Sequence, residues 1–284
     1  MNILATSGGF LPDGRWGARV GPLIRHALRL AGQPARPKLC LLATAVGDDP
    51  AAYARYYAAL ARDTPQVRAS HLALFPMPNI PDVRTHLLGQ DVIWVGGGSV
   101  ANLLAVWRAH GLDTIMREAW EAWEAGEAWE AGVVLAGVSA GSLCWHAGGT
   151  TDSFGPGLRA VTDALGLLPF SNTPHYDSEP GRRPLYQKLV ADGTLPDGWA
   201  TDDGVGLHFR GTELVEAVAD RPDVYAWRVE RIPAEPGPPA GGAAEGGVTS
   251  GVSSDGTADG GTVAGGTTGG VRETPVTPRL LSEV

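Results

Sequence analysis

A short apolar run leads directly into a serine between glycines at Val133-Val134-Leu135-Ala136-Gly137-Val138-Ser139-Ala140-Gly141. The apolar part is typical of a buried strand, and the residues that follow, Ser142 to Trp145, are compatible with a helix. The small residues at both ends of the turn allow the backbone to fold sharply and present the Ser139 hydroxyl. The amide of Ala140 would then lie at the start of the helix, where it can bind an oxyanion. We therefore predict a strand, a tight turn that carries a nucleophile, and a helix.

Four further apolar runs predict strands of the same sheet. They are Ile3–Ala5, Leu39–Leu42, Leu72–Phe75 and Val92–Val95. The stretches between them are compatible with helices, at Val20–Leu30, Ala51–Ala61 and Ala101–His110. Alternating strands and helices predict an α/β fold with a mainly parallel sheet and helices on both faces. In such sheets the reactive groups follow the carboxyl ends of the strands.

A second glycine-rich turn, Gly96-Gly97-Gly98-Ser99, follows one of these predicted strands. Three glycines allow a very close approach of the backbone, which suits a second oxyanion donor from the amide of Gly97 or Gly98. Phosphate binding at a helix start is a competing interpretation. Neither of the common phosphate-binding glycine patterns is present, however, and a plain tight turn remains the other alternative.

A serine hydroxyl needs a base, and three histidines follow Ser139 in the chain. His146 would lie about two turns along the predicted helix and point away from the serine. His208 is the most distant of the three in sequence. His175 lies in a polar loop, Asn172 to Tyr176, at what should be another strand end. We therefore predict His175 as the base.

The third member of a catalytic triad would accept the other imidazole proton. Asp152, in the polar loop Gly149 to Ser153, is our first choice, and an ordinary turn aspartate is the alternative. Asp177 is a weaker competitor because it follows His175 by two residues and is expected to face outward on the same loop.

Composition limits the classes of protein to which this chain can belong. Its 284 residues, 43% of them hydrophobic, are enough for a substantial core. A net charge of -9 makes nucleic acid and anionic membranes unexpected partners. Two cysteines, no signal-peptide pattern and no apolar run of roughly 18 residues lead us to expect a cytoplasmic protein.

Two segments stand apart from this pattern. The six residues Glu-Ala-Trp-Glu-Ala-Gly are repeated in tandem from Glu121 to Gly132, which we interpret as an elongated surface helix. From Pro233 to Arg279 the chain has no Leu, Ile, Met or aromatic residue and is rich in Gly, Pro and Thr. We therefore predict a catalytic domain over residues 1–232 and a disordered tail over 233–284.

The ordered set of motifs resembles peptidase family S51. The set is Gly96-Gly97-Gly98, Gly137 to Gly141, Thr150-Thr151-Asp152 and Pro174-His175-Tyr176. This family includes peptidase E, the α-aspartyl dipeptidase, and cyanophycinase. The resemblance covers about residues 1–230 and implies a flavodoxin-like fold related to class I glutamine amidotransferases, with serine as the nucleophile.

The resemblance also implies a role for individual residues. Ser139 is then the nucleophile, His175 the base and Asp152 the acidic member, with backbone donors from Gly98 and Ala140. It implies acylation of the serine by the substrate and release by water, without a cofactor or a metal ion.

Substrate recognition is the part of the resemblance with the most departures. Peptidase E binds the side chain of an N-terminal aspartate through an arginine after the histidine, and Arg182 and Arg183 are the candidates here, against a plain solvated basic pair. Asp203 is placed to meet the amino group of the substrate, although a surface turn would look the same. Ser99 replaces a frequent Asn, and Ser142-Leu143 replaces Ala-Asn.

We accordingly predict a serine exopeptidase that acts on short peptides, most of all on dipeptides with N-terminal Asp, as a monomer or small homo-oligomer. The alternatives are an esterase, a cyanophycinase-like hydrolase and a non-catalytic amidotransferase-like binding domain. The esterase of the α/β-hydrolase kind fits poorly, because Asp152 and His175 follow Ser139 too closely for its intervening strands and helices.

Overall fold

The computed structural model describes residues 1–282 except 16, 33, 125–131 and 234–269. Within these residues the chain forms an eight-stranded sheet, a six-stranded sheet and a two-stranded hairpin. The eight-stranded sheet runs in the order β16 (Arg279–Leu280), β13 (Glu213–Ala219), β12 (Val205–Arg210), β1 (Asn2–Thr6), β7 (Val134–Val138), β6 (Val92–Val95), β4 (Lys38–Leu42), β5 (Arg68–Leu72). The six-stranded sheet runs in the order β15 (Val271–Val276), β14 (Ala226–Arg231), β11 (Gly198–Thr201), β10 (Leu168–Pro174), β8 (His146–Thr151), β9 (Arg159–Val161). The hairpin pairs β2 (Phe10–Asp13) with β3 (Gly17–Val20).

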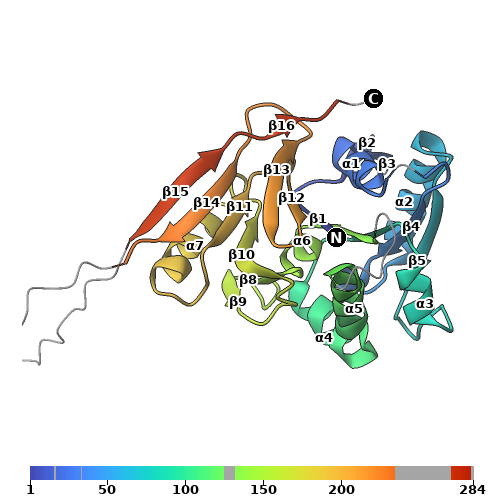
Figure 1. Cartoon of the computed structure of the whole chain (residues 1–284), viewed down its shortest axis with the longest axis horizontal. Coiled ribbons are helices and arrows are strands. Elements are labelled where there is room, and N and C mark those ends of the chain that lie inside the picture. Colours follow the sequence, from blue (N-terminus) through green and yellow to red (C-terminus); the bar gives the residue numbers. More distant parts are fainter. Residues whose placement is uncertain (16, 33, 125–131, 234–269, 283–284) are drawn as a thin grey trace, which may run out of the picture.

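The helices of the described residues include one short 3₁₀ turn, Thr44–Val46. The α-helices are α1 (Pro22–Leu30), α2 (Pro50–Asp63), α3 (Val83–Leu88), α4 (Val100–His110), α5 (Leu112–Glu124), α6 (Ala140–Leu143) and α7 (Arg182–Ala191). Figure 1 shows the two sheets side by side, with β14 and β15 at one end of the molecule and β4 and β5 at the other.

Five strands form the parallel part of the larger sheet and confirm the predicted α/β fold. β1, β7, β6, β4 and β5 are parallel neighbours in that order. Alternate residues of β4 point to opposite faces, as the pleat requires. Leu39 and Leu41 pack in the same cluster as α1 and α2, whereas Cys40 and Leu42 pack in the cluster that contains α3, α4 and α5. Helices therefore cover both faces.

The boundaries of the predicted helices agree closely with the structure, whereas one strand is displaced. The predicted strand at Leu72–Phe75 is wrong, because β5 occupies Arg68–Leu72. β5 lies at the edge of its sheet and is only partly buried, so its residues do not form an apolar run. The repeat from Glu121 begins within α5, which reaches Glu124, and residues 125–131 lie outside the described part of the chain.

The six-stranded sheet was not predicted. Its central strands β8 and β10 have the sequences HAGGTT and LPFSNTP, which contain few large apolar residues. Their buried hydroxyls are paired instead, as between Thr150 Oγ1 and Thr173 Oγ1, 3.0 Å apart. The helix after Ser139 is also shorter than predicted, since α6 ends at Leu143 and β8 begins at His146.

The C-terminal residues differ from the predicted tail. Val271–Val276 forms β15, which pairs antiparallel with β14, and Arg279–Leu280 forms β16, which pairs parallel with β13. Disorder through residue 284 was therefore wrong for these two strands. A backbone can gain this order by strand pairing at a sheet edge even where its sequence offers few apolar side chains.

Both cysteines, Cys40 and Cys144, are buried and free. Burial raises the pKa of the Cys40 thiol to about 12, so this thiol stays protonated at neutral pH. In the part of the chain that the structure covers, no helix combines the length and the apolar character needed to cross a bilayer.

Two adjacent leucines test whether the C-terminal strands are docked. Leu281 is 4% exposed and packs in the cluster with Val218, whereas Leu280 is 56% exposed. We expect Leu281→Ala to lower the free energy of unfolding by about 2 kcal/mol or more. Leu280→Ala, the matched control, should change it by less than about 0.5 kcal/mol. Urea denaturation of the full chain measures the free energy of unfolding of both variants. Equal losses in the two variants would mean that the segment of β16 and Leu281 is not packed against the larger sheet.

Candidate active site

Ser139 lies at a strained turn between β7 and α6. Its backbone has φ 58° and ψ −113°, a conformation that few residues other than glycine adopt. Its N–H donates to Thr6 O at 3.0 Å, and its carbonyl accepts from the N–H groups of Ser142 and Leu143, both at 2.9 Å. The turn is thus tied to the sheet on one side and to the helix on the other.

The two glycines around Ser139 are required by close backbone contacts. A Cβ at Gly137 would lie 2.4 Å from Gly141 O, and a Cβ at Gly141 would lie 2.2 Å from Val95 O. Neither position can hold a larger residue without movement of the backbone. The predicted strand–turn–helix arrangement is therefore present, with the serine at its tip.

The second glycine turn packs directly against the serine. A Cβ at Gly97 would lie 3.1 Å from Ser139 Cβ and 3.7 Å from Ser139 Oγ. Gly98 has φ +131°, and a Cβ there would meet Ala45 O at 2.5 Å. Ser99 caps α4 by accepting a hydrogen bond from Asn102 N at 3.1 Å. The glycine turn after β6 therefore lies in close contact with Ser139.

His175 follows β10 directly and is paired with Asp203. Its Nδ1 lies 2.5 Å from Asp203 Oδ1. The backbone of His175 has φ 61°, and its N–H donates to Ser7 Oγ at 3.3 Å. Among the residues that the structure describes, the other ring nitrogen, Nε2, makes no hydrogen bond. Both side chains are partly exposed, at 22% for His175 and 36% for Asp203.

Ser139 and His175 are positioned by the same dipeptide. Thr6 O binds the Ser139 amide, and Ser7 Oγ binds the His175 amide. Both residues belong to the described part of the chain, and no hydrogen bond joins Ser139 Oγ to the His175 ring there. Such contacts are often long in the absence of substrate and shorten when it binds. Sequence reasoning missed Thr6 and Ser7, whose only signal was their position after the first predicted strand.

Asp152 is not the partner of His175, which corrects the predicted triad. Asp152 is exposed, and its carboxylate makes no hydrogen bond within the described residues. β10 has β8 on one side and β11 on the other, so His175 has an aspartate after each neighbouring strand. The His175 ring is bonded to Asp203, beyond β11, rather than to Asp152, beyond β8.

Asp177 and Arg221 hold the Asp203 backbone. Asp177 Oδ1 accepts from Asp203 N at 2.8 Å, and Arg221 donates to Asp203 O at 2.9 Å and to Asp177 Oδ2 at 3.1 Å. Asp177, the weaker candidate for the triad, thus supports the loop of Asp203. Asp202 is buried and accepts from Tyr225 N and Trp227 Nε1, and burial raises the pKa of its carboxyl group.

A narrow cavity opens beside Ser139 and brings together most of the predicted site. Its lining residues are Gly98, Val100, Ser139, Ala140, Leu143, Thr150, Thr151, Asp152, Pro174 and Arg182. Arg182 is 4% exposed and donates to Thr150 O at 2.8 Å and to Glu179 Oε2 at 2.7 Å. These contacts fix the guanidinium in the cavity wall.

Arg183, the other predicted substrate ligand, is used elsewhere. It donates to Glu273 of β15 at 2.6 Å and lies over the ring of Trp227, 4.5 Å from its centroid. Tyr176 donates to the same glutamate. Arg183 therefore holds β15, and it does not line the cavity beside Ser139.

The other two histidines after Ser139 are buried in the sheets. His146 is fully buried at the start of β8, and burial lowers its pKa to about 4. His208 is buried in β12, and burial lowers its pKa as well. Neither follows the carboxyl end of a strand, as His175 does.

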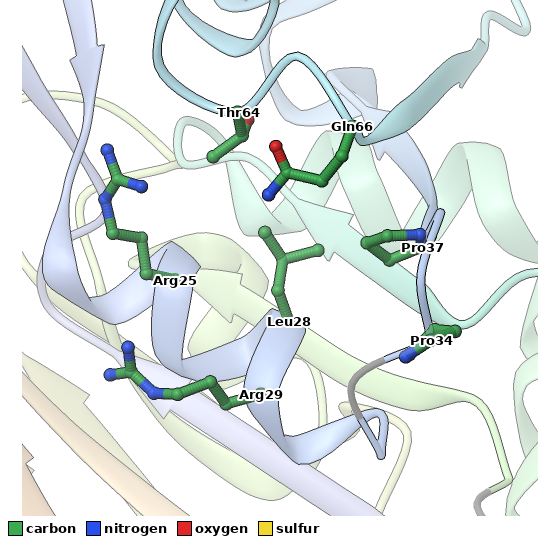
Figure 2. Close-up of a pocket in the computed structure, with 7 residues that line it drawn as sticks. All are labelled: Arg25, Leu28, Arg29, Pro34, Pro37, Thr64 and Gln66. Atoms are coloured by element: carbon green, nitrogen blue, oxygen red, sulfur yellow. The ribbon is translucent and has the colours of Figure 1, made fainter. Parts of the chain in front are cut away.

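A hollow of about 230 Å³ on another part of the surface contains none of the predicted site residues. Figure 2 shows its lining residues, Arg25, Leu28, Arg29, Pro34, Pro37, Thr64 and Gln66. Its one hydroxyl, that of Thr64, donates to Leu60 O at 3.0 Å, so the hollow offers no activated nucleophile. The candidate active site is therefore the one at Ser139.

Comparison with known proteins identifies one family and one curated relative. The family described as Peptidase family S51 matches residues 3–217. The "Uncharacterized peptidase YgaJ" of Bacillus subtilis (strain 168) is 43% identical over 194 residues, which are 68% of this chain and 78% of that protein.

Two crystal structures share the fold at low sequence identity. A candidate peptidase E protein from Listeria monocytogenes EGD-e has a TM-score of 0.52 at 20% identity and matches 75% of this chain and 96% of its own. A peptidase from an acI-B1 actinobacterium has a TM-score of 0.51 at 14% identity, over 80% and 89% of the two chains. These likenesses place the chain in the flavodoxin-like, amidotransferase-related class of folds that its sequence predicts.

The turn at Ser139 can be tested with two glycines. Gly141→Ala places a methyl group against Val95 O, so we expect a loss of stability of about 1–3 kcal/mol from overpacking. Gly157→Ala is the control, because a Cβ there meets nothing within 4 Å. It should change the free energy of unfolding by less than about 1 kcal/mol. Thermal unfolding of both variants distinguishes these outcomes, and a harmless Gly141→Ala would contradict the close contact.

Proposed function

Because this chain belongs to peptidase family S51, we propose that it is a serine-type exopeptidase that hydrolyses short peptides, above all dipeptides with an N-terminal aspartate. The strongest support is the placement of Ser139 at a strained turn against Gly97, together with a His175 whose amide is bonded to Ser7 Oγ and whose ring is bonded to Asp203. This arrangement offers a nucleophile and backbone donors beside one small cavity, and the imidazole oriented by Asp203 belongs to the residue directly after Pro174 of the cavity lining. The cytoplasm is the proposed location, in keeping with two free buried cysteines.

Each chemical step has a residue of this chain to perform it. Ser139 Oγ attacks the carbonyl carbon of the peptide bond while His175 Nε2 accepts its proton. The negative oxygen of the tetrahedral intermediate accepts hydrogen bonds from the amides of Ala140 and of Gly97 or Gly98. His175 then gives the proton to the leaving amine, and the C–N bond breaks. Water, deprotonated by the same histidine, then attacks the acyl carbon, the bond from that carbon to Ser139 Oγ breaks, and His175 returns the proton to Oγ.

Asp203 holds the imidazole in the form that this reaction needs. Its carboxylate accepts the Nδ1 proton, so Nε2 carries the lone pair that takes the serine proton. The carboxylate also stabilises the imidazolium that forms. Asp177 and Arg221 fix the Asp203 backbone and so the direction of its side chain.

Substrate recognition falls to Arg182 and Asp152, which both line the cavity beside Ser139. The guanidinium of Arg182 can bind the side-chain carboxylate of an N-terminal aspartate with the donors that Thr150 and Glu179 leave unused. The exposed carboxylate of Asp152 has no partner of its own among the described residues and can receive the free amino group. Asp203 thus takes the triad role that the sequence suggested for Asp152, and Asp152 takes the contact with the amino group that it suggested for Asp203.

A dipeptide panel tests the proposal. The panel contains Asp-X, Glu-X, Asn-X, Ala-X and β-Asp-X, and each is incubated with wild type and with Ser139→Ala. We expect Asp-X to be cleaved best and Ser139→Ala to lose about 10⁴-fold or more in kcat. Arg182→Lys should raise KM for Asp-X more than for Ala-X, whereas Arg183→Lys should not discriminate between them. Full activity of Ser139→Ala on every peptide would refute the mechanism.

The exchange of roles between the two aspartates gives a separate test. Asp203→Asn should lower kcat by about 10⁴-fold, because the imidazole loses the acceptor that fixes its tautomer. Asp152→Asn should instead raise KM for dipeptides and leave kcat within about tenfold, since it removes only an attraction to the amino group. Steady-state kinetics at neutral pH measures both. If Asp152→Asn is the variant that loses kcat, Asp203 is not the partner of the base.

A further inference from the structure

Two buried histidines and a glutamate form a cluster that the peptidase reaction does not use. His26 lies on α1, His208 on β12 and Glu216 opposite His208 on β13. His26 Nε2 is 3.5 Å and His208 Nδ1 is 3.9 Å from Glu216 Oε1. One potential ligand atom from each residue lies within 4.8 Å of the other two. None of the three residues lines the cavity beside Ser139.

The two histidine nitrogens that face the glutamate have no protein partner. His26 is 5% exposed and His208 3% exposed. Within the described residues, neither His26 Nε2 nor His208 Nδ1 takes part in a hydrogen bond. Buried polar atoms are almost always paired, so two such atoms directed at one carboxylate need an explanation. A cation between them would satisfy both nitrogens and the carboxylate together.

The tautomer of His208 strengthens this interpretation. Its Nε2 lies 2.9 Å from Asn2 Oδ1, an oxygen that can only accept, so Nε2 carries the proton. In the neutral ring, Nδ1 then presents a lone pair toward Glu216. Metal-binding histidines characteristically donate their other ring N–H to an oxygen in this way. Asn2 would therefore be the residue that orients this ligand.

We propose that His26 Nε2, His208 Nδ1 and a carboxylate oxygen of Glu216 bind a divalent transition-metal ion, with Zn²⁺ the best match to two imidazoles and one carboxylate. Tetrahedral zinc with ligands at about 2.0–2.2 Å keeps its donor atoms about 3.3–3.6 Å apart, so two of the three separations need only small adjustments. Ca²⁺ and Mg²⁺ fit poorly because they prefer oxygen ligands.

Two arginines next to the cluster affect how tightly it would bind a metal ion, and one of them links it to another strand. Arg279 of β16 donates to both oxygens of Glu216, at 2.9 and 3.0 Å, which orients the carboxylate but also competes with the metal for its charge. Arg29 adds a second positive charge close to His26. We therefore expect weaker binding than at a four-ligand structural zinc site. A bound ion would join α1 to β12 and β13. Through Glu216 and Arg279 it would also be linked to β16.

The test is Zn²⁺ binding by the full chain after treatment with a chelator. Titration against a chromophoric chelator should give one Zn²⁺ per chain for wild type, and Co²⁺ should give the visible absorption of a tetrahedral site. His26→Gln/His208→Gln should weaken the affinity by more than about 100-fold, and Asn2→Ala, which keeps all three ligands, by about 10- to 100-fold. Zn²⁺ should raise the unfolding temperature of wild type but not of the double variant.

Two control variants separate this site from other histidines. His175→Gln removes the ring at the candidate active site and His110→Gln removes an exposed ring, and both should bind Zn²⁺ as wild type does. Circular dichroism shows whether the double variant is folded. Absence of stoichiometric binding by wild type, or equal binding by the folded double variant, would overturn the proposal. Loss of binding in His175→Gln alone would do the same, because it would place the ion at the active site.

Discussion

The backbone contact between β6, β7 and α6 is the constraint on which the rest of the site depends. Gly141 lies against the carbonyl of Val95, and Gly137 lies against the carbonyl of Gly141, with no room for a side chain at either position. The helix must therefore begin immediately after the strand, and the residue between them is forced to a positive φ. That conformation directs Ser139 toward the glycine turn after β6. The position of the proposed nucleophile and that of the proposed oxyanion donors thus have one common cause.

The parallel half of the fold could be predicted because its residues carry a strong pattern. Strands buried on both faces appear as apolar runs, and the helices between them have Pro, Asp, Ser or Gly at their ends, as at Pro50 and Gly111. The six-stranded sheet lacks this signal. Its strands β8 and β10 depend on small and hydroxyl-bearing residues, which the same rules assign to loops. The C-terminal strands β15 and β16 were not predicted for a related reason. Strand pairing at a sheet edge uses backbone hydrogen bonds, which do not require a particular amino-acid composition.

The sequence was enough to predict which site residues follow the ends of strands. It was not enough to predict which side chains those residues contact. Ser139 and His175 both follow strands, and both were found by that rule. The partner of His175 depended on which neighbouring strand the ring contacts, and Asp152 and Asp203 fit that description equally well from either side of β10. The polar loop after the nucleophile helix and the family resemblance favoured Asp152, whereas the contact in the structure depends on the turn at His175, which has a positive φ. No pattern in the residues around His175 predicts that backbone conformation.

Asp203 also links the active site to the antiparallel edge of the larger sheet. It is two residues before β12, and the intervening Gly204 donates to Ser7 O while Ser7 N donates to Val205 O. Ser7 in turn holds the His175 amide, so the acid and the base are fixed through the same short segment after β1. β12 and β13 carry His208 and Glu216 further along, where Asn2 and Arg279 bring both ends of the described chain onto the same two strands. A disturbance of this edge would therefore reach both parts of the site, because Ser7 holds the His175 amide and Thr6, the residue before it, holds the Ser139 amide.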